Sequence, residues 1–508
     1  MKNNTTANPN QVEIPKEVIV CENYCAGEWT SSKSSTFEIR SPYTGSVIGN
    51  APETSVQELD RIVAAATKAQ REWGAASMKE RAQVLFRFRD ILLRDIKKIA
   101  QRISSECGKT LSEAEAEVFK GIEVTEFAVS LQNLDVGGRL EVSRGVFCEY
   151  RREPLGVVAG VTPFNFPAMV PMWMIPIALA LGDAFVWKPS DKTPLTSKLL
   201  ADALAEAGLP KGVFSIAHGG RTTVEAILDH PDVKAIGFVG STDVARAIYR
   251  RGTQNLKRVL ALGGAKNHIF LMPDADPMLT GKGVADSFTG CAGQRCMAAS
   301  VLCAIASTDG ERAAIDKLVG AIVESARSIT LGDRMGAIIS SDSLKRLEAA
   351  IAKAEADGAR VILDGRKPKA PSAYGSGGHW LGPTILDNVK PGSEAAVEEL
   401  FGPVLSIVRC ATLSEALAIQ AKSKYGNAVS VFTQNGGVAD EVSRQGRAGM
   451  VGVNIGVPVP REPFSFGGVL DSKYGHGDIT GVHSLDFWSN IKKITTKWAV
   501  QKDWSWMG

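Results

Sequence analysis

The chain has 508 residues and a formal charge of +3, from 58 Lys and Arg against 55 Asp and Glu. A charge this close to zero argues against a surface that coats nucleic acid and against an acidic tail. The composition of 44% apolar and 22% charged residues excludes disorder as the main state. At roughly 150 residues per domain, the length predicts about three domains.

The N-terminal segment 1–20 contains acidic residues and no apolar stretch, so we expect a disordered polar tail and no signal or transit peptide. The eight cysteines are too scattered for a disulfide framework, and they do not cluster with His, so no metal site is expected. A cytoplasmic location fits this pattern. The most apolar stretch, 166–181, is too short to span a bilayer and predicts a buried helix after a turn.

In chain order, the predicted elements begin with helices. Helix is predicted from about 55 to 133, with amphipathic spacing at 56–69 and 78–99. Partial alternation predicts a strand at 146–152. The pattern then changes to strand–turn–helix units, which predict a parallel sheet. The strands of this first series are expected at 156–161, 184–189, 213–220 and 235–241, and its helices at 194–207, 221–229 and 242–252.

A second series of alternating strands and helices begins near Val259. Its strands are expected at 268–273, 301–307, 405–410 and 428–434, and its long helices around 313–327 and 343–357. The stretch from Phe487 to Trp504 is basic, aromatic and β-branched. Such a terminal segment is expected to pair with another subunit or with a sheet edge.

Two segments carry candidate reactive groups. In FTGCAGQRCMA (288–298), small residues surround Cys296, and Arg295 directly before it could favour a thiolate. Cys296 could equally be a small core residue, and Cys291 is the competing nucleophile in the same loop. In TPFNFP (162–167), at a strand end, the amide of Asn165 could stabilise an oxyanion or simply belong to a turn.

Two further segments suggest a nucleotide site. In VWKPSDKTP (186–194), Lys188 and Asp191 could contact phosphate or ribose hydroxyls, although a capped helix start explains this segment better on its own. In FVGSTD (238–243), a strand passes through Gly-Ser into a helix, whose free N–H groups suit a pyrophosphate. The segment is not GxGxxG, so alone it is a weak signal.

In their order and spacing, TPFNFP, KPSDKTP, FVGSTD, LGGAKNH, AGQRC and EELFGPV resemble the aldehyde dehydrogenase superfamily from about residue 35 to 500. Within it, the sequence is most similar to the CoA-acylating methylmalonate/malonate semialdehyde dehydrogenases. The resemblance implies an α/β fold with an open αβ cofactor domain, an αβ catalytic domain and a small β oligomerisation arm. The expected ranges are 21–133 and 153–259 for the NAD-binding domain, 260–475 for the catalytic domain, and 134–152 and 476–508 for the arm.

The resemblance also implies site roles and partners. Cys296 should be the nucleophile and Asn165 the oxyanion donor, in a homodimer or homotetramer that uses NAD and coenzyme A. The expected contacts with NAD are Thr162, Phe164, Lys188, Asp191, Lys192, Ser241, Gly263, Glu399 and Phe401. Asp191 should favour NAD over NADP, because a carboxylate beside the ribose repels a 2′-phosphate, although Lys188 and Lys192 partly offset this preference.

One departure bears on the mechanism. Hydrolytic members of the superfamily carry a Glu four residues before the Lys of an LGGK-type segment, where this chain has Leu262 or Ala261. The span 244–273 contains no Asp or Glu, so no general base for water is expected there. The acylating subfamily also lacks this Glu.

Recognition of a substrate carboxylate falls to two candidate cations, Arg295 and Lys120. Relatives of this subfamily tend to carry Arg at the position of Lys120. Because Lys lacks the bidentate fork of Arg, a different short semialdehyde stays open as the substrate.

The expected function is NAD-dependent oxidation of a short (methyl)malonate-type semialdehyde through a thioester on Cys296. Transfer of the acyl group to CoA, in the cofactor cleft, would give propionyl-CoA or acetyl-CoA. The first alternative is a CoA-independent dehydrogenase acting on another short semialdehyde. A non-catalytic relative is disfavoured by the presence of Cys296 and Asn165, and a nucleotide-binding regulator by the lack of a basic stripe. No nucleic acid and no membrane are expected as partners.

Overall fold

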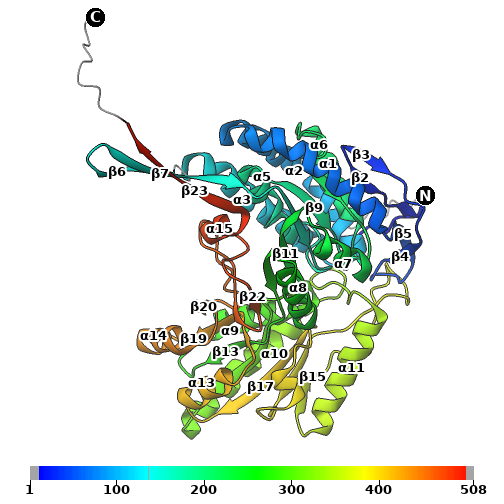
Figure 1. Ribbon diagram of the computed structural model, residues 1–508. Coiled ribbons are helices and arrows are strands. Elements are labelled where there is room, and N and C mark those ends of the chain that lie inside the picture. The colour runs from blue at the N-terminus through cyan, green and yellow to red at the C-terminus, as the bar shows by residue number, and fades with distance from the viewer. Residues whose placement is uncertain (1–10, 135–136, 499–508) are drawn as a thin grey trace, which may run out of the picture.

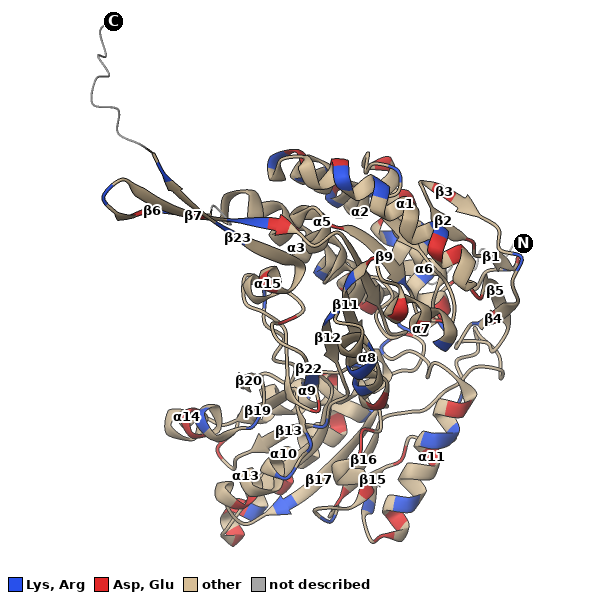
Figure 2. Cartoon of the chain, viewed as in Figure 1, with Lys and Arg blue, Asp and Glu red and all other residues tan. Residues whose placement is uncertain are grey.

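The computed structural model describes residues 11–134 and 137–498. Two α/β lobes, each built on a mostly parallel sheet, lie one above the other, and a narrow β arm projects from the upper lobe (Figure 1). Basic and acidic residues are interspersed along exposed helices such as those of the lower lobe (Figure 2). Within the described ranges, no helix is both long enough and apolar enough to cross a membrane.

The first sheet has eight strands in the order β22-β12-β11-β8-β9-β10-β2-β3. Its parallel centre consists of β12 (Arg258–Leu262), β11 (Val233–Val239), β8 (Val157–Val161), β9 (Ala184–Lys188) and β10 (Phe214–Ile216), and its antiparallel edges are β22 (Lys473–Tyr474), β2 (Asn23–Cys25) and β3 (Glu28–Thr30). The chain adds strands in one direction from β8 to β10 and then in the other from β11. Ligands of doubly wound sheets bind at the carboxyl ends of the strands at such a switch point, here β8 and β11.

Three long helices precede this sheet in the chain, within the range 55–133 that was predicted as helical. They are α1 (Val56–Ala75), α2 (Met78–Cys107) and α3 (Leu111–Leu134), and both α1 and α2 begin with a capping box. The segment 166–181, predicted as one buried helix, is indeed largely buried, but it forms two short helices, α4 (Met169–Met172) and α5 (Ile175–Leu181). The remaining helices of this lobe, α6 (Leu195–Glu206), α7 (Arg221–Asp229) and α8 (Thr242–Gln254), confirm the predicted ones.

The second sheet has seven strands in the order β15-β16-β17-β14-β13-β19-β20, all parallel except the edge strand β15. Its strands are β13 (Asn267–Leu271), β14 (Ala299–Ile305), β15 (Arg360–Leu363), β16 (Thr384–Asp387), β17 (Val404–Cys410), β19 (Ala428–Phe432) and β20 (Met450–Val453). The helices of this lobe are α9 (Pro277–Thr289), the 3-10 turn η1 (Gly290–Gly293), α10 (Asp309–Arg327), α11 (Ser341–Ala356), α12 (Glu394–Val397), α13 (Leu413–Ala421) and α14 (Gly436–Gln445). The strands and long helices predicted for the second series are therefore confirmed.

The prediction of a disordered tail at 1–20 is wrong for residues 11–20, and residues 1–10 lie outside the described ones. Val12 is buried, and its backbone N–H donates to the hydroxyl of Tyr374 at 2.9 Å. Strand β1 (Ile19–Val20) pairs with β5 (Val47–Pro52), which also pairs with β4 (Thr36–Arg40). A few apolar side chains that pack in the native structure outweigh the polar composition of the segment.

The arm is a three-stranded antiparallel sheet of β6 (Gly138–Ser143), β7 (Val146–Pro154) and β23 (Ser489–Lys497). It extends away from both lobes (Figure 1). The two predicted arm segments therefore do pair, although residues 499–504 of the predicted terminal segment lie outside the described part.

The structure corrects two predicted domain boundaries. Strand β12 crosses the expected boundary at 259/260, because its ladder to β11 keeps it in the first sheet as far as Leu262. Further along, β21 (Val469–Leu470) pairs with β18 (Tyr425–Gly426), and the chain then returns to the first sheet at β22. After β22 it runs through η2 (Val482–Ser484) and α15 (Leu485–Trp488). Phe487 and Trp488 are buried in the core of the first lobe, so the segment before Ser489 belongs there and not to the arm.

Candidate active site

Cys296 lies in the short connection between η1 and β14, in the lower lobe. Cys291, Ala292 and Gly293 in η1 all have positive φ, between 52° and 67°. A Cβ atom on Gly293 would lie 2.1 Å from the carbonyl oxygen of Gly402. Only glycine allows this approach, which packs the Cys296 loop against the segment that carries Glu399 and Phe401.

Two buried asparagines hold the backbone of Cys296. The side-chain amides of Asn267 on β13 and Asn427 before β19 both donate to the Cys296 carbonyl, at 2.7 and 2.9 Å. Asn267 also donates to the carbonyl of Ala298 and accepts from the N–H of Ala428. The central strands of the second sheet thus fix the backbone of the loop through its carbonyl groups.

Asn165 reaches the same loop from the first lobe, where it follows β8. Its Nδ2 donates to the carbonyl of Gln294 at 2.8 Å, two residues before Cys296. The side chain of Gln294 is itself held by the N–H of Ile339 at 3.0 Å. Asn165 is buried, and since an amide has two N–H groups, one remains for a developing oxyanion.

The electrostatic surroundings of Cys296 favour the protonated thiol. Burial raises the pKa of Cys296 to about 12, and the charge of Glu399 acts in the same direction. Arg295 lowers the pKa of this thiol, as the sequence suggested, but burial outweighs it. The competing Cys291 is buried, and its pKa is raised to about 11.

Candidate groups for the nicotinamide end of a cofactor include Glu399, whose charge acts on Cys296. Glu399 accepts a hydrogen bond from the N–H of Ala265 at 2.9 Å, and burial raises the pKa of its carboxyl. Gly263 lies so close to a neighbouring backbone that a Cβ atom there would meet the Asp471 carbonyl at 2.5 Å. The rings of Phe164 and Phe401 meet edge to face, with centroids 5.9 Å apart.

Three further residues predicted to contact NAD lie at the carboxyl ends of β8, β9 and β11. Lys188 is buried at the end of β9; its Nζ donates to the carbonyl of Gly219 at 2.9 Å, and burial lowers its pKa. Thr162 accepts from the indole of Trp187 at 2.9 Å. Ser241 is the N-cap residue of α8 and makes no side-chain cap, which leaves the first N–H groups of this helix to other partners.

The two charged residues after Lys188 differ in their surroundings. Asp191 is exposed, and Lys192 holds its Nζ 5.3 Å from the centre of the Phe164 ring. A second carboxylate that sequence reasoning missed, Glu53, accepts from the N–H of Gly220 at 3.0 Å. The charges of Asp191 and Glu53 both act on Lys188 and favour its protonated form.

The two candidate cations for a substrate carboxylate are both engaged by protein groups. Lys120 on α3 forms ion pairs with Glu462 at 2.7 Å and with Glu123 at 3.0 Å. Arg295 uses one Nη to donate to the carbonyls of Asp286 and Ser287, at 2.5 and 2.9 Å. The Nε of Arg295 is buried and has no partner among the described residues, so this arginine retains donor capacity.

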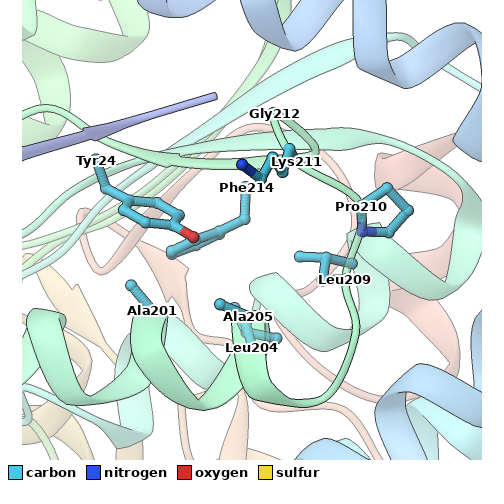
Figure 3. Close-up of a pocket in the computed structure, with 9 residues that line it drawn as sticks. All are labelled: Tyr24, Ala201, Leu204, Ala205, Leu209, Pro210, Lys211, Gly212 and Phe214. Atoms are coloured by element: carbon cyan, nitrogen blue, oxygen red, sulfur yellow. The ribbon is translucent and has the colours of Figure 1, made fainter. Parts of the chain in front are cut away.

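Two cavities lie away from these residues. One, of about 10 Å³, lies between α6 and β10 and is lined by apolar side chains including Leu204 and Phe214 (Figure 3). It has room for a single water molecule at most. The other, of about 390 Å³, lies beside α10, and its lining arginines Arg360 and Arg409 both pair with Asp387. Neither cavity includes Cys296.

Known proteins match this chain over most of its length. The model of the Aldehyde dehydrogenase family matches residues 29–494. Malonate-semialdehyde dehydrogenase 2 of Bacillus cereus is 39% identical over 487 residues, which cover 94% of this chain and 98% of that protein.

Solved structures are similar over almost the whole chain. Methylmalonate-semialdehyde dehydrogenase from Oceanimonas doudoroffii superposes with a TM-score of 0.92 at 35% identity, covering 95% of this chain and 99% of that one. A protein from Sinorhizobium meliloti 1021, provisionally named as the same enzyme and complexed with NAD, gives a TM-score of 0.91 at 35% identity, covering 96% and 99%. The predicted fold and resemblance are therefore confirmed: the chain belongs to the aldehyde dehydrogenase family and is an oxidoreductase.

Proposed function

We propose that this protein oxidises a short (methyl)malonate-type semialdehyde with NAD, through a thioester on Cys296, and transfers the acyl group to CoA. The observation that carries the proposal is the convergence of the Asn165 amide and the Cys296 loop, joined by the hydrogen bond to Gln294. The names of the similar proteins and the NAD complex of one of them support the substrate and the cofactor.

The residues present suit NAD. The uncapped start of α8 at Ser241 offers N–H groups to a pyrophosphate, and Asp191 and Glu399 offer carboxylates to ribose hydroxyls. Asp191 and Glu53 together place two negative charges at the adenosine end, which disfavours the additional phosphate of NADP. When bound, NAD supplies the acceptor for the hydride of the substrate.

In the acylation half, Cys296 gives its proton to solvent water and its sulfur forms a bond to the aldehyde carbon, whose oxygen becomes an oxyanion. Asn165 Nδ2 and the backbone N–H of Cys296 stabilise this oxyanion. Loss of hydride from the carbon then restores the carbonyl and leaves an acyl thioester on Cys296.

In the deacylation half, this chain lacks a carboxylate where the hydrolytic relatives carry their base. Ala261 and Leu262 are both buried in β12. Glu399, whose charge does act on Cys296, is already bonded to the N–H of Ala265. The CoA thiolate therefore displaces the Cys296 thiolate. With a β-carboxylated substrate, carbon dioxide is lost and a proton from solvent takes its place on the carbon, which gives propionyl-CoA or acetyl-CoA.

Arg295 is the better supported of the two candidate cations for the substrate carboxylate, because it keeps an unpaired buried Nε. Lys120 contributes less, since a substrate must compete with Glu462 for its charge.

We further propose that the arm joins subunits into a homodimer or homotetramer. All eight cysteines are free thiols, which supports a reducing, cytoplasmic compartment.

The test is a panel of short semialdehydes and propanal, assayed for NADH and for product with and without CoA. The proposal predicts acyl-CoA as product and little turnover without CoA. Cys296→Ala should abolish NADH formation, whereas the matched control Cys291→Ala should keep it. Equal turnover without CoA, with the free acid as product, would favour the hydrolytic alternative and remove the acylating one.

A further inference from the structure

The first two turns of α3 contact both segments that form the proposed oxyanion site. Glu113 accepts a hydrogen bond from the N–H of Cys291, in the Cys296 loop, at 2.6 Å. Glu117, one turn further, accepts from the N–H groups of Ala168 and Met169, at 2.8 and 3.0 Å, just after Asn165. Because residues four apart lie on the same side of a helix, one face of α3 holds both segments.

The charge of Glu117 is balanced by a lysine that contacts the same segment. Lys109, just before α3, forms an ion pair with Glu117 at 2.5 Å, and both side chains are almost fully buried. The Nζ of Lys109 also lies 3.4 Å from the centre of the Phe166 ring. The ion pair therefore contacts the segment next to Asn165 at two points: Lys109 contacts the ring of Phe166, and Glu117 accepts from the backbone N–H groups of Ala168 and Met169.

The contacted segment is directly connected to the proposed reaction site through Asn165. Asn165 precedes Phe166 and lies three residues before Ala168, and its amide makes the bond to Gln294 that joins the two lobes. Stabilisation of an oxyanion needs donors at hydrogen-bond distance from the oxyanion, and a misplacement of about 1 Å can cost on the order of a hundredfold in rate. The hydrogen bonds of Glu117 and the ring contact of Lys109 are with this segment, so this route to the reaction passes through Asn165. The charge of Lys109 also acts on Cys291, in the Cys296 loop.

We propose that Glu117, with its partner Lys109, is a positioning residue that sets Asn165 in the oxyanion site. It acts through the backbone of the segment 165–169 and touches no reacting atom. Glu113 holds the opposite half of the site from the same helix face. The inference rests on the proposed function, because it requires Asn165 to be the oxyanion donor.

A double-mutant cycle on the full-length protein tests this inference. Single-turnover NADH formation is measured for the wild type, Glu117→Gln, Asn165→Ala and the double variant, with the affinity for NAD measured in parallel. We expect Glu117→Gln to lower the rate at least roughly tenfold with NAD affinity unchanged, because it unbalances Lys109 and shifts the segment. In the Asn165→Ala background the same substitution should have no further effect.

A matched control and a second variant keep the test decisive. Glu115→Gln, on the same helix, should leave the rate unchanged. If Glu117→Gln fails to accumulate, Lys109→Met combined with Glu117→Gln removes both buried charges together and enters the same cycle. An equal loss of rate in both backgrounds would overturn the positioning role alone, whereas full activity of Asn165→Ala would overturn the oxyanion assignment of the proposed function as well.

Discussion

At the scale of single residues, Cys296 lies in surroundings that oppose its ionisation. Burial raises the pKa of its thiol to about 12, and Glu399 is the second cause in the same direction. A group with a raised pKa holds its proton until a higher pH, so the thiolate is scarce near neutrality. Neutralising Glu399 removes a negative charge that destabilises the thiolate, and this lowers the pKa.

Glu399→Gln should therefore make Cys296 more reactive in the absence of cofactor. We expect its alkylation by iodoacetamide to be several-fold faster at mildly alkaline pH, with the pH–rate curve moved to lower pH. The measurement uses the Cys291→Ala background, and Glu398→Gln, which alters an exposed carboxylate paired with Lys424, serves as the control. A curve unchanged or moved to higher pH would contradict this account of the thiol.

Glu462 offers a test of substrate recognition. It pairs with Lys120 at 2.7 Å, so Glu462→Gln frees part of the charge of this lysine for a ligand. The ratio of kcat/KM for a carboxylated semialdehyde to that for propanal should rise several-fold. As a control, Glu126→Gln on α3, the helix that carries Lys120, alters only the pair with Arg89 and should leave this ratio unchanged. An unchanged ratio in Glu462→Gln would show that Lys120 plays no part in selecting the carboxylate.

Residues inside local motifs could be predicted from the sequence, and residues that act across the fold could not. Cys296 and Asn165 each lie among small or aromatic neighbours with a recognisable spacing. Glu117 lies within an ordinary helical pattern, and only tertiary packing brings it to the backbone after Asn165. Asn427 likewise gives no local signal for its bond to the Cys296 carbonyl.

At the scale of elements, the turn η1 depends on a glycine. Gly293 has a φ of 67° and lies against the Gly402 carbonyl, so Gly293→Ala meets both backbone strain and a steric clash. We expect at least roughly a tenfold loss of kcat and a lower melting temperature. Gly310→Ala in α10 has open space around it and should be neutral or slightly stabilising. Wild-type kcat in Gly293→Ala would contradict the proposed packing of the loop.

Periodicity predicted most elements, and its failures have physical causes. The helices α1 and α2 follow apolar patterns that repeat at helical spacing, and the central strands of both sheets are short, continuous apolar runs. The boundary near 259 could not be predicted, because the place of β12 depends on its ladder to β11, a non-local contact. The ordering of Val12 depends in the same way on Tyr374, which is distant in the sequence.

At the scale of the whole molecule, the arm carries the proposed subunit contact. Its exposed apolar residues include Leu140 at 68% and Val142 at 52% exposure, on the edge strand β6. Leu140→Asp combined with Val142→Asp should lower the molar mass measured by light scattering toward that of a smaller assembly, without loss of folding. Val56→Asp, an exposed position on α1, is the control. An unchanged mass would place the subunit contact elsewhere.

The two lobes meet beside Cys296, the proposed nucleophile, and the central claim is that its acyl group passes to CoA and not to water. The direct measurement is the intact mass of the protein after mixing with NAD and a semialdehyde in the absence of CoA. We predict that an acyl adduct on Cys296 accumulates, persists, and is discharged as acyl-CoA when CoA is added. Continued NADH formation without CoA, with free acid released and no adduct on Cys296, would contradict the account.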